Sequence, residues 1–355
     1  MAGTRLGLGG ASLAAAALLA MFVAAPVGGA TSCTPTGFVR DSIDLTAAVI
    51  NPSAPVSGAL DATGCNIGVY FGPGSHGKVV NADIGGANYY GVVNDGGDVD
   101  VSRSTIHDIG ETPLNGTQHG VGIYFAFGSS ATGSITLNTL SNYQKGGIVV
   151  NGTGSSASIV GNRVIGQGPV GYIAQNGIQV GYGARAVVLG NTVTGNAYSG
   201  LNDASSGGII LVGGPWYGGD FTTGVLVSGN TVTGNDVGIW LSNLNADASA
   251  AATPTRDTVL GNTVTNGAVT NTTGNTTTGY QAGIADQGDG DWIVANVVCG
   301  VGYTPVAGDQ PYLRFIDADS SFTNDVHLVG NRTCSTSSGP PHHRPWRFWP
   351  QPGGR

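Results

Sequence analysis

The chain has 355 residues, of which 62 are glycine and only 10% are charged. So much glycine excludes a fold of long helices, because each glycine inside a helix costs roughly 0.5–1 kcal/mol relative to alanine. The formal net charge of -8 opposes nucleic-acid binding, which requires a basic surface. We therefore expect short strands and tight turns, and no nucleic-acid partner.

Residues 1–30 are predicted to be a secretion signal peptide. Arg5 supplies the positive charge, residues 13–23 form the apolar stretch, and Gly28-Gly29-Ala30 is a small-residue cleavage site. The apolar stretch is too short for a membrane span, so we expect a secreted protein without one. Lipoprotein anchoring at Cys33 is the less favoured alternative, because the three residues before it match a lipobox poorly.

Residues 31–66 are predicted to cap one end of a repeat that occupies residues 67–334. Gly-Asn-Thr-Val-Thr occurs at 190–194, 229–233 and 261–265, with looser copies centred on Asn138, Asn162, Asn296 and Asn331. A second mark, glycine followed by isoleucine or valine, recurs at Gly68, Gly91, Gly122, Gly147, Gly177, Gly208, Gly238 and Gly283. Self-similarity at such periods indicates a solenoid.

The spacing of the asparagine mark indicates a parallel β-helix of about nine coils. It varies from 22 residues (Ala82 to Ser104) to 39 (Asn191 to Asn230), which fits loops of any length between stacked strands. Two strands per coil are clearly marked, and a third is expected. An inward asparagine can bond the turn backbone and the asparagines above and below, so we expect an Asn ladder.

These repeats, from about Gly68 to Asn331, resemble the right-handed parallel β-helix superfamily with the pectate-lyase-like fold. The resemblance implies an all-β, single-stranded solenoid. The superfamily contains polysaccharide lyases, glycoside hydrolases, mannuronan epimerases and non-catalytic surface proteins. The Asp-Pro-His of mannuronan epimerases is absent, and of the Gly-His-Gly of polygalacturonases only His119-Gly120 is present. The resemblance therefore implies a fold and no catalytic residue.

The four cysteines are predicted to form two disulfides, which export permits. Cys299 and Cys334 each lie three positions after a repeat asparagine, so they belong at equivalent points of adjacent coils. Stacked strands lie about 4.8 Å apart, within the Cα separation of about 4.4–6.8 Å that a disulfide accepts. We predict Cys299–Cys334 and, by elimination, Cys33–Cys65. Metal binding is the rival, but no Cys-x-x-Cys pair exists.

The face that carries the Gly-Ile mark is predicted to bind a ligand. If the Ile or Val points inward, the next residue points outward, because strand side chains alternate. Flat rings with a polar handle suit sugar stacking, and the polar residues before each glycine and the insert at 213–224 flank the same strand. The predicted substrate-binding residues are Tyr124, Trp240, Trp216, Gln144, Gln175, Gln179 and Asp236. Packing of the rings against the flanking loops is the alternative.

Lys145, one of two lysines, is the centre of the predicted chemistry. In β-elimination on a uronate, a cation stabilises the carboxylate, and a lysine of lowered pKa can take the C5 proton. His119, His107 and Asp108 lie in neighbouring coils and complete a candidate acid/base set. The alternative is that these residues have no catalytic role: Lys145 is a solvated lysine at a turn, and the histidines form hydrogen bonds within turns.

The loop from Asp286 to Asp291 is acidic. Calcium takes six to eight oxygen ligands, so Asp286, Asp289 and Asp291 are candidate calcium ligands, although such turns occur without metal more often than with it. Residues 335–355 are basic and aromatic and are predicted to be disordered. They are either a tether to an anionic cell-surface polymer or a tail without function.

The expected protein is monomeric and secreted, and it binds an acidic extracellular polysaccharide along the Gly-Ile face. As an enzyme it would be a polysaccharide lyase or uronate epimerase, less so a glycoside hydrolase. The alternative is a non-catalytic extracellular adhesion or structural protein. Ice binding by Thr194, Thr233 and Thr265 is a third, weaker interpretation, because the threonine row is short.

Overall fold

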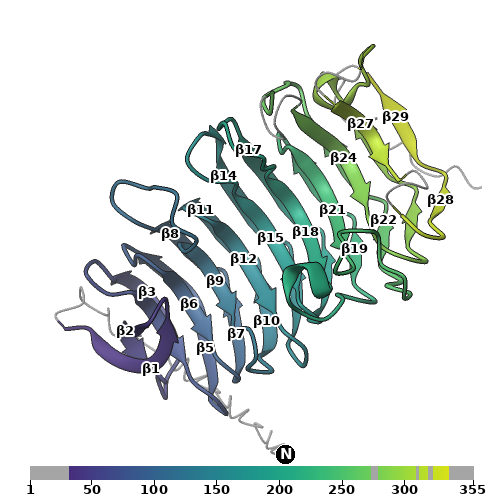
Figure 1. Cartoon of the computed structure of the whole chain (residues 1–355). Coiled ribbons are helices and arrows are strands. Elements are labelled where there is room, and N and C mark those ends of the chain that lie inside the picture. The colour runs from purple at the N-terminus through teal and green to yellow at the C-terminus, as the bar shows by residue number, and fades with distance from the viewer. Residues whose placement is uncertain (1–31, 273–278, 309–311, 319–322, 336–355) are drawn as a thin grey trace, which may run out of the picture.

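The structure is a computed structural model that describes residues 32–272, 279–308, 312–318 and 323–335. Its strands stack into an elongated solenoid (Figure 1). The predicted signal peptide at 1–30, and all of the predicted tail at 335–355 except Ser335, lie outside the described residues.

Sheet A contains one strand from each coil. Its eleven strands, in spatial order, are β1 Thr34–Arg40, β2 Ile43–Ile50, β4 Ile67–Phe71, β6 Tyr90–Asn94, β9 Val121–Phe125, β12 Gly146–Asn151, β15 Asn176–Gly181, β18 Gly207–Gly213, β21 Val237–Asn243, β24 Tyr280–Asp286 and β27 Tyr312–Asp317. All neighbours pair in parallel except β1 and β2, which form an antiparallel hairpin.

Sheet B contains the other strands, which form two parallel rows. Short turns join most strands of the first row to those of the second. The first row is β3 Val56–Asp61, β5 His76–Gly85, β7 Asp98–Ser102, β10 Thr132–Thr136, β13 Ser156–Val160, β16 Arg185–Leu189, β19 Leu226–Ser228, β22 Thr258–Leu260, β25 Trp292–Val294 and β28 His327–Val329. The second row is β8 Thr105–Ile109, β11 Thr139–Tyr143, β14 Arg163–Val170, β17 Thr192–Tyr198, β20 Thr231–Thr233, β23 Thr263–Thr265, β26 Val297–Cys299 and β29 Arg332–Cys334. The long β5 pairs with strands of both rows.

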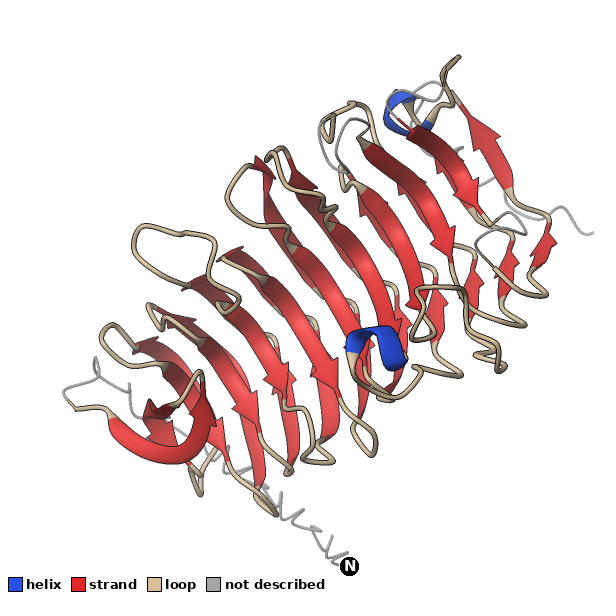
Figure 2. Ribbon diagram, in the orientation of Figure 1, coloured by secondary structure: helices blue, strands red, loops and turns tan. Residues whose placement is uncertain are grey.

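A typical coil therefore has three strands, one in sheet A and two in sheet B, and every strand pairs with its equivalent in the next coil. This confirms the predicted parallel β-helix and supplies the weakly marked third strand. Strands dominate the described residues, and two short 3-10 helices, η1 Pro215–Tyr217 and η3 Val301–Tyr303, lie in connecting loops (Figure 2). None of the helices in the described part of the chain has the length and apolar character to cross a membrane.

The core is a set of apolar columns that run along the solenoid. In sheet A the inward residues Val69, Val92, Ile123, Ile148, Ile178, Ile209, Ile239 and Ile284 are all 0% exposed. Each coil packs mainly on its neighbours, so stability is approximately the sum of such steps.

The recurring glycine is explained by packing. At Gly238 a Cβ atom would lie 2.3 Å from Cγ1 of Val264 and 2.5 Å from the carbonyl oxygen of Gly283. An apolar side chain of sheet B and a carbonyl oxygen of the next coil make the same two approaches at Gly68, Gly91, Gly122, Gly147, Gly177, Gly208 and Gly283. The Gly-Ile mark thus records where sheet A comes closest to sheet B.

A column of asparagines occupies the turns between the two rows of sheet B. From each to the next, Nδ2 donates to Oδ1 at 2.9–3.0 Å, and the same Oδ1 accepts the main-chain N–H. The members are Asn138, Asn162, Asn191, Asn230, Asn262, Asn296 and Asn331. These bonds satisfy polar groups that are almost fully buried in every member except the last, Asn331, which is partly buried.

Both predicted disulfides are present. Cys299 and Cys334 are register partners on β26 and β29, with Cα atoms 4.6 Å apart. Cys33 and Cys65 have a Cα separation of 5.4 Å and fix the start of β1 to the turn before β4.

Candidate functional site

The outer face of sheet A carries one in-register column of side chains that includes three predicted site residues. Tyr124, Val149, Gln179, Ile210, Trp240 and Ala285 follow one another across successive coils. Gln179 and Trp240 are half-buried. Gln179 donates from Nε2 to Oδ1 of Asn151 at 3.0 Å. Because Gln179 and Trp240 are partly exposed, they remain candidates for ligand contact.

Tyr124 is not available, which corrects the prediction. It is 3% exposed because the β1–β2 hairpin, residues 34–50, folds over this end of sheet A (Figure 1). The Phe38 ring lies 6.5 Å from the Tyr124 ring, Tyr90 stacks on Tyr124 at 4.9 Å, and the Arg40 guanidinium is 5.8 Å above it. Tyr124 is therefore part of a second apolar cluster under the hairpin.

Gln144 is also wrongly predicted as a ligand residue. It is 0% exposed, and its side chain fixes the loop between β8 and β9. Its Oε1 accepts the N–H groups of Glu111 at 3.1 Å and Asn115 at 3.0 Å, while Nε2 donates to the Thr117 carbonyl at 2.8 Å.

Gln175 and Asp236 also bond neighbouring main-chain segments and are likewise 0% exposed. Gln175 Oε1 accepts the N–H of Gln167 at 3.0 Å. Asp236 Oδ2 accepts the N–H groups of Tyr198 at 2.7 Å and Ser206 at 2.9 Å. Burial raises the pKa of Asp236 to about 7, against the effect of these bonds. The polar column before the glycines thus anchors inserts and does not line a groove.

His119 is a buried member of a hydrogen-bonded pair. It is 7% exposed, and its ring stacks on Tyr89 with centroids 3.8 Å apart. Its Nε2 lies 2.6 Å from Oε1 of Glu111, and its Nδ1 lies 4.0 Å from Oδ2 of Asp41 in the hairpin turn.

His107 and Asp108 belong to a separate cluster on β8 of sheet B. His107 Nδ1 lies 2.6 Å from Oδ2 of Asp108, and its Nε2 lies 3.1 Å from Oδ1 of Asp83. No hydrogen bond or ion pair between described residues joins this cluster to His119 or Lys145. The predicted four-residue acid/base set is therefore not assembled, because the loop from residue 110 to 120 separates β8 from β9.

Lys145 directly precedes β12, a central strand of sheet A that pairs with β9 and β15. Its main-chain N–H donates to Gly120, and its Nζ donates to the carbonyl oxygen of Ala174 at 2.9 Å. Burial lowers the pKa of Lys145 to about 8. Within the described part of the chain, Lys145 has no carboxylate ion-pair partner. It is a desolvated amine held by a neutral acceptor.

Aromatic rings continue from Trp240 toward the C-terminal coils. The Trp240 ring lies 6.3 Å from Tyr280, which stacks on Tyr312 at 5.7 Å, and the Arg314 guanidinium is 3.7 Å above Tyr312. Trp240 Nε1 donates to Oε1 of Gln287 at 3.0 Å. Sequence reasoning missed Tyr280, although it lies three positions before a Gly-Ile mark.

The insert between β18 and β19 places further rings beside this face. Trp216 of η1 is 55% exposed. The adjacent Tyr217 hydroxyl bonds Oγ of Ser242 on β21 at 2.7 Å, which fixes η1 against sheet A. Trp216 therefore remains a candidate stacking residue. Tyr217, which the sequence analysis did not include, joins the candidate site.

The predicted calcium residues do not gather around one point. Asp286 and Asp291 are 0% exposed and interact with a third buried carboxyl, Asp257, while Asp289 interacts with Asp286. Burial, with Asp257 and Asp286 beside it, raises the pKa of Asp291 to about 9. No group of three or more His, Cys, Asp or Glu in residues 32–335, outside the undescribed gaps, is placed to hold a metal ion. Calcium ligation stays a prediction.

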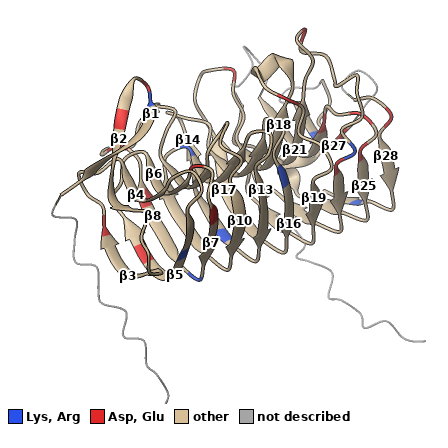
Figure 3. Cartoon of the chain, turned by 90° about the horizontal axis from the view of Figure 1, so that it is seen from below, with Lys and Arg blue, Asp and Glu red and all other residues tan. Residues whose placement is uncertain are grey.

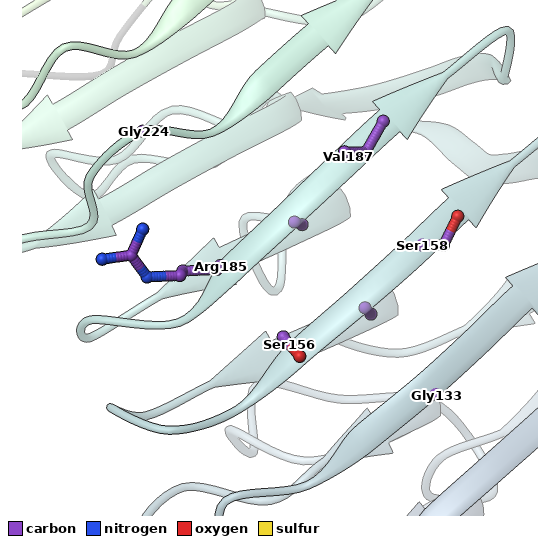
Figure 4. A pocket seen from close by; sticks show the side chains of 8 residues that line it. Gly133, Ser156, Ser158, Arg185, Val187 and Gly224 are labelled. Atoms are coloured by element: carbon purple, nitrogen blue, oxygen red, sulfur yellow. The ribbon is translucent and has the colours of Figure 1, made fainter.

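A shallow depression of about 320 Å³ lies on sheet B, away from these residues (Figure 4). It is lined by Gly133, Ser156, Ala157, Ser158, Arg185, Ala186, Val187 and Gly224. None of the predicted site residues lines it. Charged residues are few and dispersed along the coils (Figure 3). Strongly shifted pKa values occur at Lys145, at Asp236 and at the buried carboxyls around Asp291.

The fold defines the chain as a parallel β-helix protein. No protein-family model matches the sequence, and no curated protein matches it. The A-module of Azotobacter vinelandii mannuronan C-5 epimerase AlgE4 has a TM-score of 0.38 and 12% identity, covering 87% of this chain and 84% of that one. A double mutant of the periplasmic alginate epimerase AlgG has a TM-score of 0.33 and 11% identity, and the match covers 80% of this chain and 74% of that one. Tailspike protein 3 of bacteriophage CBA120 has a TM-score of 0.30 and 13% identity, and the match covers 82% of this chain and 56% of that one. Such distant similarity gives no information on activity.

Proposed function

We propose that the protein binds an acidic polysaccharide along the outer face of sheet A, with Lys145 as the cation that pairs with a uronate carboxylate. The observation that carries this proposal is the amine itself. Lys145 is desolvated, it directly precedes a strand of sheet A, and its only described hydrogen-bond acceptor is a neutral carbonyl.

Burying a charge without a counter-charge is unfavourable, and the lowered pKa of Lys145 reflects that cost. A ligand carboxylate beside Nζ would supply the missing counter-charge and restore the ammonium form. A neutral sugar would not. The site therefore favours an anionic ligand even though the whole chain is acidic.

Two arginines at the ends of the same face support an anionic chain ligand. Arg40 lies above Tyr124 at the hairpin, and Arg314 lies above Tyr312 in the last coil of sheet A. Between them, Trp240 and Trp216 offer ring surfaces on which sugars stack. The ligand would run across the coils, from the β1–β2 hairpin toward the Tyr280–Tyr312 pair.

Elimination or epimerisation of the bound uronate is the second candidate, favoured by the same lowered pKa. A neutral Lys145 amine near pH 8 would accept the C5 proton. In elimination the C4–O bond then breaks, a C4=C5 double bond forms, and the departing O4 takes up a proton from water. His119, His107 and Asp108 form hydrogen bonds elsewhere, so Lys145 would be the one catalytic side chain in this reaction. We therefore favour binding without reaction.

The two disulfides agree with export to an oxidising compartment, where such polymers occur. We propose that the protein acts there as a monomer.

The test is a panel of polyuronates and matched neutral polysaccharides, measured for binding and then incubated with the protein in heavy water for mass spectrometry. Retention of polyuronates alone, with masses unchanged, is the expected result. Unsaturated fragments would favour a lyase, and deuterium gained at constant length would favour an epimerase. Equal retention of neutral polymers, or none at all by folded protein, would contradict the proposal.

A further inference from the structure

Three aspartates are buried where the turns that leave sheet A enter sheet B in the C-terminal coils. Asp286 ends β24, Asp291 directly precedes β25, and Asp257 directly precedes β22. All three residues are 0% exposed. Within the described residues, no lysine, arginine or histidine forms an ion pair with any of them. Several uncompensated charges buried together are unfavourable, so the cluster needs a neutralising partner.

In Asp257 and Asp286, every carboxyl oxygen already accepts a hydrogen bond. The donors, at 2.8–3.4 Å, are the main-chain N–H groups of Val225 and Gly288, the Asn243 amide and the Thr323 hydroxyl. These bonds join turns of neighbouring coils. Neither side chain has an oxygen that lacks a donor.

Asp291 differs from both. Its Oδ1 accepts from the Thr255 hydroxyl at 2.7 Å and from the Asp257 N–H at 2.6 Å. Its Oδ2 is the one buried side-chain atom among the described residues that has no hydrogen-bond partner, and such an atom requires an explanation. The carboxyl of Asp286 lies within hydrogen-bonding reach of Asp291, but two ionised carboxyls are both acceptors and cannot bond each other.

The Asn ladder shows what is missing from this cluster. In that ladder Oδ1 accepts the main-chain N–H of the preceding coil, and Nδ2 donates to the next asparagine. Asp257 and Asp291 reproduce the first bond, because their Oδ1 atoms accept the N–H groups of Val225 and Asp257. They lack the second bond, because an ionised carboxyl has no hydrogen to donate. A protonated carboxyl has one, and it then resembles asparagine.

A proton fits this position better than a metal ion. Calcium takes six to eight oxygen ligands, but N–H and O–H donors already point at the other oxygens of the cluster. A Cβ atom at Gly288 would overlap Oδ2 of Asp291, so the backbone closes the space beside that oxygen. A single hydrogen between two carboxyl oxygens needs no such space.

The other titratable groups on the packed elements bring no positive charge into contact with the cluster. Arg256 is exposed, and Nε2 of His327 lies 4.0 Å from Oδ2 of the exposed Asp325. The remaining groups are acidic or phenolic: Asp289 beside Asp286, and Asp317 on β27, which accepts from the Tyr280 hydroxyl at 2.8 Å.

We propose that Asp291 carries a proton on Oδ2 at neutral pH and donates it to the carboxylate of Asp286. The proton thereby joins the end of β24 to the start of β25 and closes the turn between the two sheets. The same turn holds Gln287, whose Oε1 accepts from the indole N–H of Trp240. The C-terminal coils are thus locked by a proton and loosen in alkali, whether or not the protein binds a polysaccharide.

The pH dependence of this lock has a definite sign. Burial, with Asp257 and Asp286 beside it, raises the pKa of Asp291 to about 9 from its ordinary value of 3.8. Between these pH values the folded chain holds a proton that the unfolded chain has released. Each pH unit in this range therefore lowers the folding equilibrium constant by up to about tenfold. The cost of burying Asp291 is absent below about pH 4, grows as pH rises and is complete near pH 9.

The first test compares urea denaturation of wild type and Asp291→Asn at about pH 5 and pH 9. Asparagine cannot ionise and supplies a permanent donor, so from pH 5 to pH 9 the unfolding constant of wild type should rise at least about tenfold more than that of the variant. Asp236 and Lys145 also titrate in this range, but both are present in each protein. Asp289→Asn is the matched control on the same turn, and it should keep the wild-type pH dependence. Equal pH dependence of wild type and Asp291→Asn would overturn the proposal.

The second test detects the proton itself in wild-type protein, so that a variant that fails to fold cannot decide the result. Infrared spectroscopy should show the C=O stretch of a protonated carboxyl at pH 7, a contribution that disappears above about pH 9 and is absent from folded Asp291→Asn. A wild-type spectrum without a protonated carboxyl at pH 7 would contradict the assignment. So would a rise in stability on adding calcium that Asp291→Asn abolishes, because a metal ion would then neutralise the cluster.

Discussion

Lys145 donates from Nζ to the carbonyl oxygen of Ala174 at 2.9 Å, across the step between two coils of sheet A. The carbonyl accepts one hydrogen bond from the amine, but as a neutral group it does not compensate the positive charge. In the described structure this lysine is therefore held in position without being neutralised, which is the state expected of a residue whose counter-ion arrives with a ligand.

The pH dependence of binding follows from the lowered pKa of Lys145. A carboxylate binds the ammonium form, and the free protein loses that form as pH rises through about 8. Affinity for a polyuronate should therefore be constant below that pH and fall up to about tenfold per pH unit above it. Lys145→Arg, which stays protonated, should remove the decline. Calorimetric titration from about pH 6 to 10 measures both, and a wild-type curve that stays flat would argue against the ammonium as the contact.

Stability should change in the opposite direction from binding. Because the pKa of Lys145 is lowered in the folded protein, its burial penalty is fully present below pH 8 and disappears as pH rises toward the ordinary value of 10.5. Lys145→Met should thus stabilise the protein at pH 7 by about 1 kcal/mol, a figure reduced for partial exposure of the side chain. Urea denaturation at pH 7 and near pH 10 checks this. Destabilisation at both pH values would mean that Lys145 has a structural role.

The glycine mark gives a prediction about packing alone. Gly238→Ala should destabilise the solenoid by about 1–3 kcal/mol, because the new Cβ would overlap Val264 and Gly283. Gly267→Ala is the matched control. No atom lies within 4 Å of its Cβ position and its φ is not positive, so its denaturation midpoint should stay at the wild-type value. Equal midpoints for the two variants would contradict the packing explanation.

The Phe38 ring of the hairpin is predicted to contribute to stability and not to ligand contact. Phe38→Ala removes a half-buried ring from Tyr90 and Tyr124, which should cost roughly 1–2 kcal/mol. Hydrogen exchange should rise in residues 34–50, while affinity for the polysaccharide changes less than twofold. A large loss of affinity with unchanged exchange would place the ring in the binding surface instead.

The solenoid could be predicted from sequence because its signals are local and repeated. Asn191, Asn230 and Asn262 occur in the same short motif, so their stacking follows from one alignment. The pairing of Cys299 with Cys334 follows from the same alignment, since each stands three positions after its asparagine.

The candidate site was less predictable because it depends on parts that do not repeat. Nothing in residues 34–50 indicates that Phe38 covers Tyr124, since antiparallel pairing of β1 over a parallel sheet has no periodic signal. Gln144 and Asp236 precede the glycine mark and are polar, which predicts a ligand contact, but the neighbouring loops fold onto them and use their hydrogen bonds. Lys145 was identified by its rarity, and its desolvation depends on the whole coil around it.

The most direct measurement is the affinity of three proteins for one polyuronate at pH 7: wild type, Lys145→Met and Lys78→Met. Lys78 is the only other lysine in the sequence and lies on sheet B beside Asp100, 3.9 Å away and exposed. If Lys145 is the carboxylate partner, Lys145→Met loses about 10- to 100-fold in affinity, the value of a charged hydrogen bond, and Lys78→Met binds like wild type. Equal affinity for all three proteins would contradict the assignment of Lys145.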